Sequence, residues 1–198
     1  MFDYSLNNDE ELLRQLRLPK PDSDIAFMDI YLKYSNKLNS YCMLKLFDRE
    51  ITKDIIQEIW LEFVKAVKNG INIHDIKSYL INIAHNIIYN YQIQNQKKSQ
   101  MFVNEDGIYF DGISFNYNLQ ESLENADLLA IVKLCASNLE EPCREIYLLK
   151  KFNDLTFVEI ANITGDSIQS IKRNFSKASI MMHKLLKPYF DEMKNERI

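Results

Sequence analysis

Five basic side chains gather on one short segment near the carboxyl end of the sequence. Residues 166–187 read DSIQSIKRNFSKASIMMHKLLK, and after Asp166 they contain no acidic residue. The whole chain nevertheless has a formal net charge of -4 at pH 7, so the cationic character is local. A local cationic patch can bind an anion even when the protein as a whole is acidic. The chemistry that this segment favours is the binding of nucleic-acid phosphates.

The residues around the start of this segment predict a helix-turn-helix. Thr156 followed by Glu159 is a capping-box signature, so a helix should begin at Phe157. Gly165 can end that helix in a left-handed turn, and Ser167 can cap the next helix. Two helices joined by about three residues around a glycine form a helix-turn-helix.

The second of these two helices should have an apolar and a polar face. At about 100° per residue, the apolar stripe collects Ile171, Phe175, Ala178, Met182 and Leu185. The opposite side carries amide, hydroxyl, guanidinium and ammonium groups, which read base edges and hold phosphates in a major groove. These outward residues are Gln169, Ser170, Lys172, Arg173, Ser176 and Lys177, while Lys184 and Lys187 lie farther along and should contact phosphates or solvent.

The elements that must position this helix are themselves helices. With only four Gly and four Pro among 198 residues, and long runs without helix breakers, the chain favours an all-α fold. Helical patterns cover residues 9–18, 24–47, 52–70 (with Thr52 as the expected cap) and 75–96, and helices return over 122–190. We therefore expect two small helical domains, a four-helix bundle over 1–96 and a helix-turn-helix domain over 122–198. Residues 97–121 join them, and their alternating apolar residues between 101 and 119 fit either a small hairpin or a linker whose aromatic side chains dock on a neighbour.

Several function classes are disfavoured. The first residues do not form a secretory leader and no segment is long and apolar enough to span a bilayer, so a soluble, cytoplasmic protein is expected. The three cysteines form no C-x-x-C pair and have no histidine at metal-ligand spacing, which predicts reduced, buried thiols and neither a metal nor another cofactor. We find no phosphate-binding glycine loop and no nucleophile pair, so the protein is not expected to be an enzyme.

The helix expected at 52–68 has an unusual outer face. Its buried stripe is predicted to be Ile56, Ile59, Trp60, Phe63 and Val67. An apolar Leu61 lies opposite this stripe among acidic and amide side chains, which suits a docking surface for another protein better than plain solvation. The polar members of this outer face are Asp54, Gln57, Glu58 and Lys65.

Three motifs in this order resemble a known family. KDIIQEIWLEF, SYLINIAHNIIYNY and LEEPCREIYLLKKFNDLTFVEIANITGDSIQSIKRNFSKAS are similar to the bacterial RNA polymerase sigma factors of the extracytoplasmic-function (ECF) group. The resemblance covers residues 9–96 and 122–187. It implies two helical domains, regions 2 and 4, joined by a variable linker.

The resemblance also implies roles for residues. Asp54, Gln57, Glu58 and Leu61 match the face that docks on the clamp helices of the largest polymerase subunit. The loop 69–75 and the helix 78–90 match the part that melts and captures the promoter -10 element, with Asn69, Asn72, His74, Tyr79, Asn86 and Tyr89 as candidate contacts. Region 4 would read the -35 element through Ser167, Gln169, Ser170, Lys172, Arg173, Ser176 and Lys177.

The sequence also departs from the family pattern. The arginines that usually follow the I-A-x-N run are absent, and only Lys97 and Lys98 stand at its far end. Tyr79 stands where tryptophan is usual, so strand capture should rely more on tyrosine stacking and amide hydrogen bonds. Asp166 replaces a usual apolar residue before the recognition helix, which predicts a differently packed turn.

The implied partners are core RNA polymerase, through its clamp helices and flap, and promoter DNA, with an anti-sigma protein as a further candidate. The implied function is a sigma factor that directs promoter-specific initiation in a bacterial cytoplasm. The alternative is a helix-turn-helix regulator that binds DNA without joining the polymerase. Such a regulator has no need of the outer face around Leu61.

Overall fold

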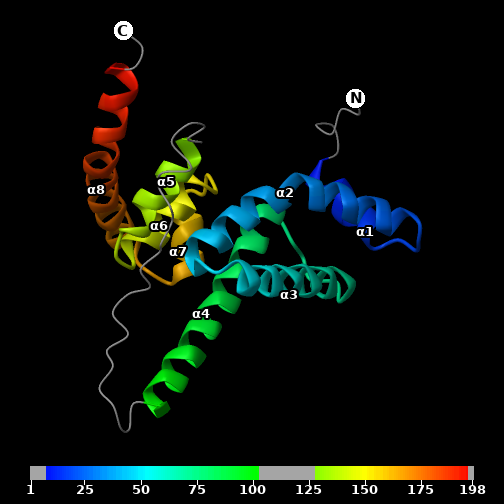
Figure 1. Ribbon diagram of the computed structural model, residues 1–198. Helices are drawn as coiled ribbons and strands as arrows, with labels where there is room; N and C mark the ends of the chain where they lie inside the picture. Colours follow the sequence, from blue (N-terminus) through cyan, green and yellow to red (C-terminus); the bar gives the residue numbers. More distant parts are fainter. Residues whose placement is uncertain (1–7, 103–127, 196–198) are drawn as a thin grey trace.

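The computed structural model describes residues 8–102 and 128–195, and in these ranges the only regular elements are helices (Figure 1). In chain order they are α1 (Asp9–Leu16), α2 (Asp22–Leu46), α3 (Arg49–Lys68), α4 (Ile76–Phe102), α5 (Leu128–Ser137), α6 (Cys143–Lys151), α7 (Phe157–Thr164) and α8 (Ile168–Asn195). The predicted all-α fold is confirmed. The alternatives left open for residues 101–119 fall almost wholly outside the described residues.

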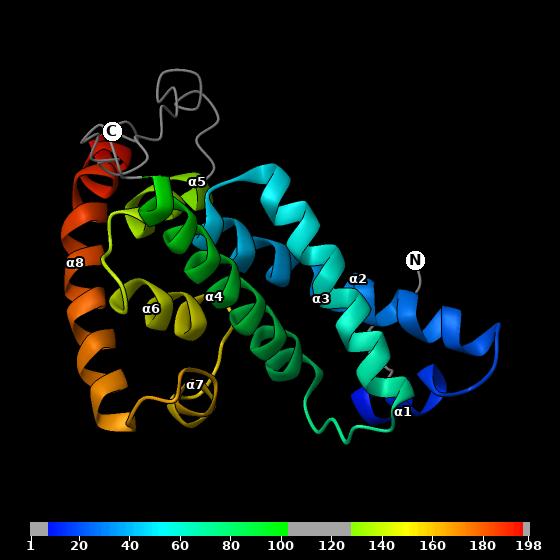
Figure 2. The same ribbon diagram turned by 90° about the horizontal axis from the view of Figure 1, so that it is seen from below.

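Helices α1–α4 pack on one another, and we call them the N-terminal group; helices α5–α8 form the C-terminal group. Helix α4 is a part of the N-terminal group that faces the C-terminal group, with α3 on one side of it and α6 and α7 on the other (Figure 2). It continues to Phe102, beyond the boundary expected at residue 96. The buried apolar residues form one continuous cluster across both groups.

Helix α3 shows how local signals fix the elements. Thr52 was expected to cap this helix, but that expectation is wrong. The cap is Asp48, whose carboxylate accepts a hydrogen bond from the Ile51 amide at 3.0 Å, while Thr52 is buried one turn into the helix. Asp48 is able to take this position because Phe47 ends α2 in the left-handed conformation and reverses the chain before α3. At the other end Gly70, with φ of 76°, stops the helix as predicted.

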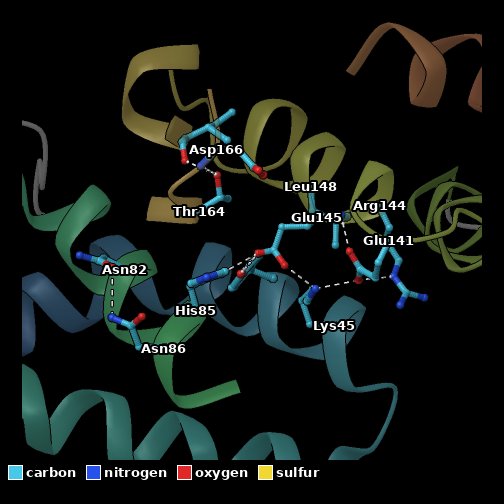
Figure 3. Close-up of polar contacts among 12 residues, drawn as sticks. Lys45, Asn82, His85, Asn86, Glu141, Arg144, Glu145, Leu148, Thr164 and Asp166 are labelled. Atoms are coloured by element: carbon cyan, nitrogen blue, oxygen red, sulfur yellow. Dashed lines mark hydrogen bonds and ion pairs between the residues drawn. The ribbon is translucent and has the colours of Figure 1, made fainter. Parts of the chain in front are cut away.

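The two groups meet around one buried carboxylate, that of Glu145 on α6 (Figure 3). It accepts hydrogen bonds from the ammonium of Lys45 and the hydroxyl of Tyr41 on α2, the latter at 2.6 Å. Nδ1 of His85 on α4 lies 3.1 Å from the same carboxylate. Lys45 also binds Glu141 at 2.7 Å. We call these five residues the Glu145 cluster.

The Glu145 cluster sets the ionisation of its central carboxylate. Burial alone would raise the pKa of Glu145, but the hydrogen bond from His85 and the charge of Lys45 outweigh it and lower the pKa to about 2. The same burial and the neighbouring carboxylate raise the pKa of Tyr41, so its hydroxyl stays protonated and donates. A charged Glu145 therefore has three donors in the interior, as a buried carboxylate requires.

The lowered pKa predicts an acid-dependent loss of stability. A carboxylate with a folded-state pKa of about 2 and an ordinary pKa of 4.5 stabilises the folded chain above pH 4.5 and loses this contribution as the pH falls toward 2. The effect should be on the order of 3 kcal/mol at 1.36 kcal/mol per pKa unit. Urea unfolding between pH 7 and 2.5 should show a steeper decline for the natural chain than for Glu145→Gln. Equal slopes for the two chains would contradict this electrostatic account.

Candidate functional site

The helix-turn-helix forms through the interactions that the sequence predicts. The Thr156 hydroxyl accepts from the Glu159 amide at 3.2 Å, and the Glu159 carboxylate accepts from the Thr156 amide at 2.6 Å, which completes the capping box of α7. Gly165 ends α7 with φ of 75°. Ser167 then caps α8 by accepting from the Ser170 amide at 3.2 Å.

Inside the turn, Asp166 is exposed and its amide donates to the Thr164 hydroxyl at 3.3 Å (Figure 3). A polar residue is therefore accommodated here because its side chain stays in solvent.

The inward stripe of α8 is close to the predicted one. Ile171, Ala178 and Met182 are buried, whereas Phe175 and Leu185 are half-buried at the margin of the core. The Phe175 ring contacts Phe157 of α7 edge-on at 5.6 Å and lies nearly parallel to the Tyr147 ring of α6 at 6.2 Å. These aromatic contacts fix the angle at which α8 leaves the turn.

The outward face of α8 is open to solvent. Ser170 is half-buried, and the other six candidate residues are exposed: Ser167, Gln169, Lys172, Arg173, Ser176 and Lys177. The structure thus brings the predicted base-reading and phosphate-binding groups onto one surface. The Lys172 ammonium lies 5.9 Å from the centre of the Phe157 ring, a cation–π contact at the start of that surface.

The outer face of α3 has the predicted composition. Asp54, Gln57 and Glu58 are exposed, and Leu61 among them is 61% exposed. On the opposite side Ile59, Trp60, Phe63 and Val67 are buried as expected, while Ile55 takes the fully buried place expected for Ile56, which is half-buried. An apolar side chain is therefore held in solvent by a helix whose other face is anchored in the core.

The candidate -10 residues fall into two kinds. Asn69 directly follows α3. Farther along the loop that leads to α4, the side-chain amide nitrogen of Asn72 lies 3.3 Å from Nε2 of His74. All three side chains are exposed. Asp75 then caps α4 by accepting from the Ser78 amide. The loop 69–75 thus presents three nitrogen-bearing side chains to solvent.

The remaining -10 candidates lie on α4 itself. Tyr89 is 56% exposed and its ring stacks on that of His85, with centroids 6.2 Å apart. Asn86 is exposed and bonds to Asn82 at 3.2 Å (Figure 3). Tyr79, in contrast, is half-buried against Phe63 at 6.4 Å, so its ring is partly used by the core.

The described residues form neither a metal-binding group nor a membrane-spanning helix. Within 8–102 and 128–195, no group of three or more His, Cys, Asp or Glu side chains could hold a metal ion. None of the helices described is long and apolar enough to cross a membrane. The three cysteines are buried and unpaired, and burial raises the pKa of the Cys42 thiol to about 12, which leaves it unreactive.

No family model matches the chain. The RNA polymerase sigma factor YlaC of Bacillus subtilis is 20% identical over 164 residues, which cover 79% of this chain and 89% of YlaC. The RNA polymerase sigma-H factor of Pseudomonas aeruginosa is 23% identical over 173 residues, which cover 84% and 89%. The matched lengths extend well beyond a helix-turn-helix.

Two solved structures share the fold. The sigma factor RpoE, in complex with the anti-sigma factor NepR from Bartonella quintana, superposes with a TM-score of 0.63 at 21% identity, covering 81% of this chain and 96% of RpoE. CnrH, in complex with the cytosolic domain of CnrY, gives a TM-score of 0.63 at 16% identity, with coverage of 91% and 97%. The resemblance that the sequence motifs predict is thus confirmed: in sequence and in fold, the chain is similar to the RNA polymerase sigma factors.

Proposed function

We propose that the chain is a sigma factor of the ECF kind, which binds core RNA polymerase and directs it to promoters. The observation that carries the proposal is the presence of two different surfaces in one chain. One is the exposed face of α3 around Leu61, and the other is the open polar face of α8 around Arg173. Sequence similarity to sigma factors over most of the chain supports the same function.

The two surfaces suit two different ligands. An exposed leucine flanked by carboxylates and an amide fits a protein partner, because burial of the leucine supplies affinity and the polar rim supplies specificity. We assign this face to the clamp helices of the largest polymerase subunit. The face of α8 around Arg173 carries no acidic residue between Ile168 and Lys187 and fits the -35 element, with the flap of the polymerase beside it.

The -10 element is assigned to the loop 69–75 and the exposed part of α4. Tyr89 supplies an open aromatic ring on which an unpaired base can stack, and Asn86 supplies amide donors and acceptors next to it. Tyr79 supports these contacts mainly through packing, since its ring is partly buried against Phe63. Residues 1–96 would thus form region 2, residues 122–198 region 4, and residues 97–121 the connection.

A regulator that binds DNA without the polymerase remains the competing function. It shares the helix-turn-helix, but it gives no reason for an exposed leucine on α3 or for sequence similarity that reaches through the N-terminal group. We also propose an anti-sigma protein as a regulator, because RpoE was solved with the anti-sigma factor NepR. The place of action would be the bacterial cytoplasm, where polymerase and promoter DNA are found.

The docking face of α3 gives the first test of this function. Leu61→Asp combined with Gln57→Ala should weaken binding to core polymerase at least about tenfold, because a buried leucine contributes about 1.5–3 kcal/mol and 1.4 kcal/mol is a factor of ten. Binding is measured by co-purification and titration with core enzyme, and helicity by circular dichroism. The matched control is Leu32→Asp with Asn36→Ala, an exposed pair at the same spacing on α2. Equal binding of the natural chain and a well-folded Leu61 variant would refute the docking assignment.

The recognition face of α8 gives the second test. Arg173 is exposed on the second turn of the helix, so Arg173→Ala should cost about 1–3 kcal/mol of promoter binding and relax the preference at one or two upstream positions. Lys184, three turns farther on, should contact only phosphate, and Lys184→Ala should weaken all sequences alike and by less. Binding of the polymerase complex to a set of upstream-element variants measures both. A natural preference retained at every upstream position by Arg173→Ala would contradict this placement.

A further inference from the structure

The loop that joins α3 to α4, residues 69–75, is held at both ends by its own residues. The Ile71 amide donates back to the last turn of α3 at 3.0 Å, and Asp75 caps α4. Between them Ile73 is buried, with 6% exposure, and belongs to the core. Asn72 and His74 flank this buried residue and are exposed, so the loop offers their side chains to a ligand.

A further contact with this loop comes from a distant part of the sequence. Arg17 directly follows α1 and stands 54 positions before Ile71. Nη2 of its guanidinium donates to the carbonyl oxygen of Ile71 at 3.1 Å. The amide and the carbonyl group of Ile71 are thus both bonded, which fixes the backbone immediately before Asn72.

Helix α1 gives Arg17 a firm support. Its buried leucine side chains pack on α2. At the start of the helix, the Asp9 carboxylate binds the ammonium of Lys33 on α2 at 2.7 Å. Arg17 therefore reaches the loop from a helix that is anchored along its length. This helix lies outside the three sequence motifs that carry the resemblance to sigma factors.

Helix α4 supplies little positive charge of its own to a strand captured at this loop. Lys77 is the only lysine or arginine between residues 76 and 96, and its ammonium donates to the carbonyl oxygen of Asp154 at 3.5 Å. The phosphates of a bound single strand need cations close by. Arg17 is exposed and bonded to the loop. Because a guanidinium has several N–H groups, its bond to Ile71 leaves donors for a phosphate.

We propose that Arg17 is a positioning residue of the -10 site, which fixes the loop 69–75 in the form that receives a base and binds the phosphate of the same nucleotide. What the loop binds rests on the proposed function, whereas the hold of Arg17 on the loop does not. A cation from the end of α1 thus stands in for the arginines that are absent from α4.

The hold on the loop is tested on the full chain without polymerase or DNA. Arg17→Met keeps an unbranched apolar stem but removes the donors. The NMR order parameters of the backbone amides of residues 71–74 should therefore fall from about 0.85 toward about 0.6. Arg14→Met is the matched control, because this arginine lies one turn earlier and binds Glu11 within α1, so the order parameters of the loop should not change. A loop that is already flexible in the natural chain, or equally rigid in Arg17→Met, would overturn the proposal.

The phosphate contact is tested with the complex of the chain and core polymerase, which is titrated with single-stranded oligonucleotides that carry -10 sequences. Loss of one phosphate contact in Arg17→Met should reduce the slope of log affinity against log salt concentration by about 0.7. The preference for one base of the element should also relax. Arg17→Lys keeps the charge and should restore the slope, but it should restore the preference only in part, because an ammonium lacks the planar fork of a guanidinium.

The outcomes separate this inference from the proposed function. A natural -10 preference and salt slope retained by Arg17→Met would overturn the role of Arg17 and leave the proposed function intact. An equal loss of slope in Arg14→Met would also overturn it, because the effect would then be one of net charge. A polymerase complex of the natural chain with no -10 preference would refute the assignment of the loop under the proposed function, and this inference with it.

Discussion

A carboxylate removed from water is the constraint on which the arrangement of this chain depends. Glu145 is charged and buried, so cations and hydroxyl groups must surround it. Its donors come from α2 and α4, whereas Glu145 itself lies on α6. The same interactions that satisfy one side chain therefore align three helices that are far apart in the sequence. The position of the helix-turn-helix relative to the first four helices follows from that alignment.

Helix α4 carries the largest number of roles. It packs against α2 and α3, exposes the candidate -10 residues, and contacts α7 through Ser78. Burial would raise the pKa of Glu159, but the hydrogen bonds from Thr156 and Ser78 outweigh it and lower the pKa. One carboxylate thus caps the helix-turn-helix and holds it on α4. A change of position of the C-terminal group would therefore alter the surroundings of the candidate -10 residues on α4.

Local signals in the sequence predicted the elements well, because each depends on a few neighbouring residues. The capping box at Thr156, the glycine at 165 and the serine cap at 167 are all found as predicted. Thr52 was misread because Asp48, four residues earlier, competes for the same role and forms the cap. The outer faces of α3 and α8 could also be predicted, since helical periodicity alone separates exposed from buried positions.

The contact between the two groups could not be predicted in the same way, because it joins residues about 100 positions apart. The sequence did hold a signal: Lys45 falls on the buried stripe of α2 one heptad after Leu38, and Glu145 falls on the stripe of α6 that includes Leu148 and Leu149. A charge on an apolar stripe needs an opposite charge, but only the folded chain shows which one. The roles of the outer faces of α3 and α8 likewise depend on partner molecules. The sequence indicates only what kind of chemistry such a partner would need.

Reconstituted transcription tests the central claim, that this chain is a sigma factor, most directly. Core RNA polymerase is supplied with a library of promoter fragments, with and without the chain, and the transcripts are sequenced. The account predicts that adding the chain yields transcripts from a subset of templates that share both a -10 and a -35 sequence, with little initiation from core enzyme alone. The absence of any template-specific initiation with a folded chain that binds DNA would contradict it and would favour a regulator that acts without joining the polymerase.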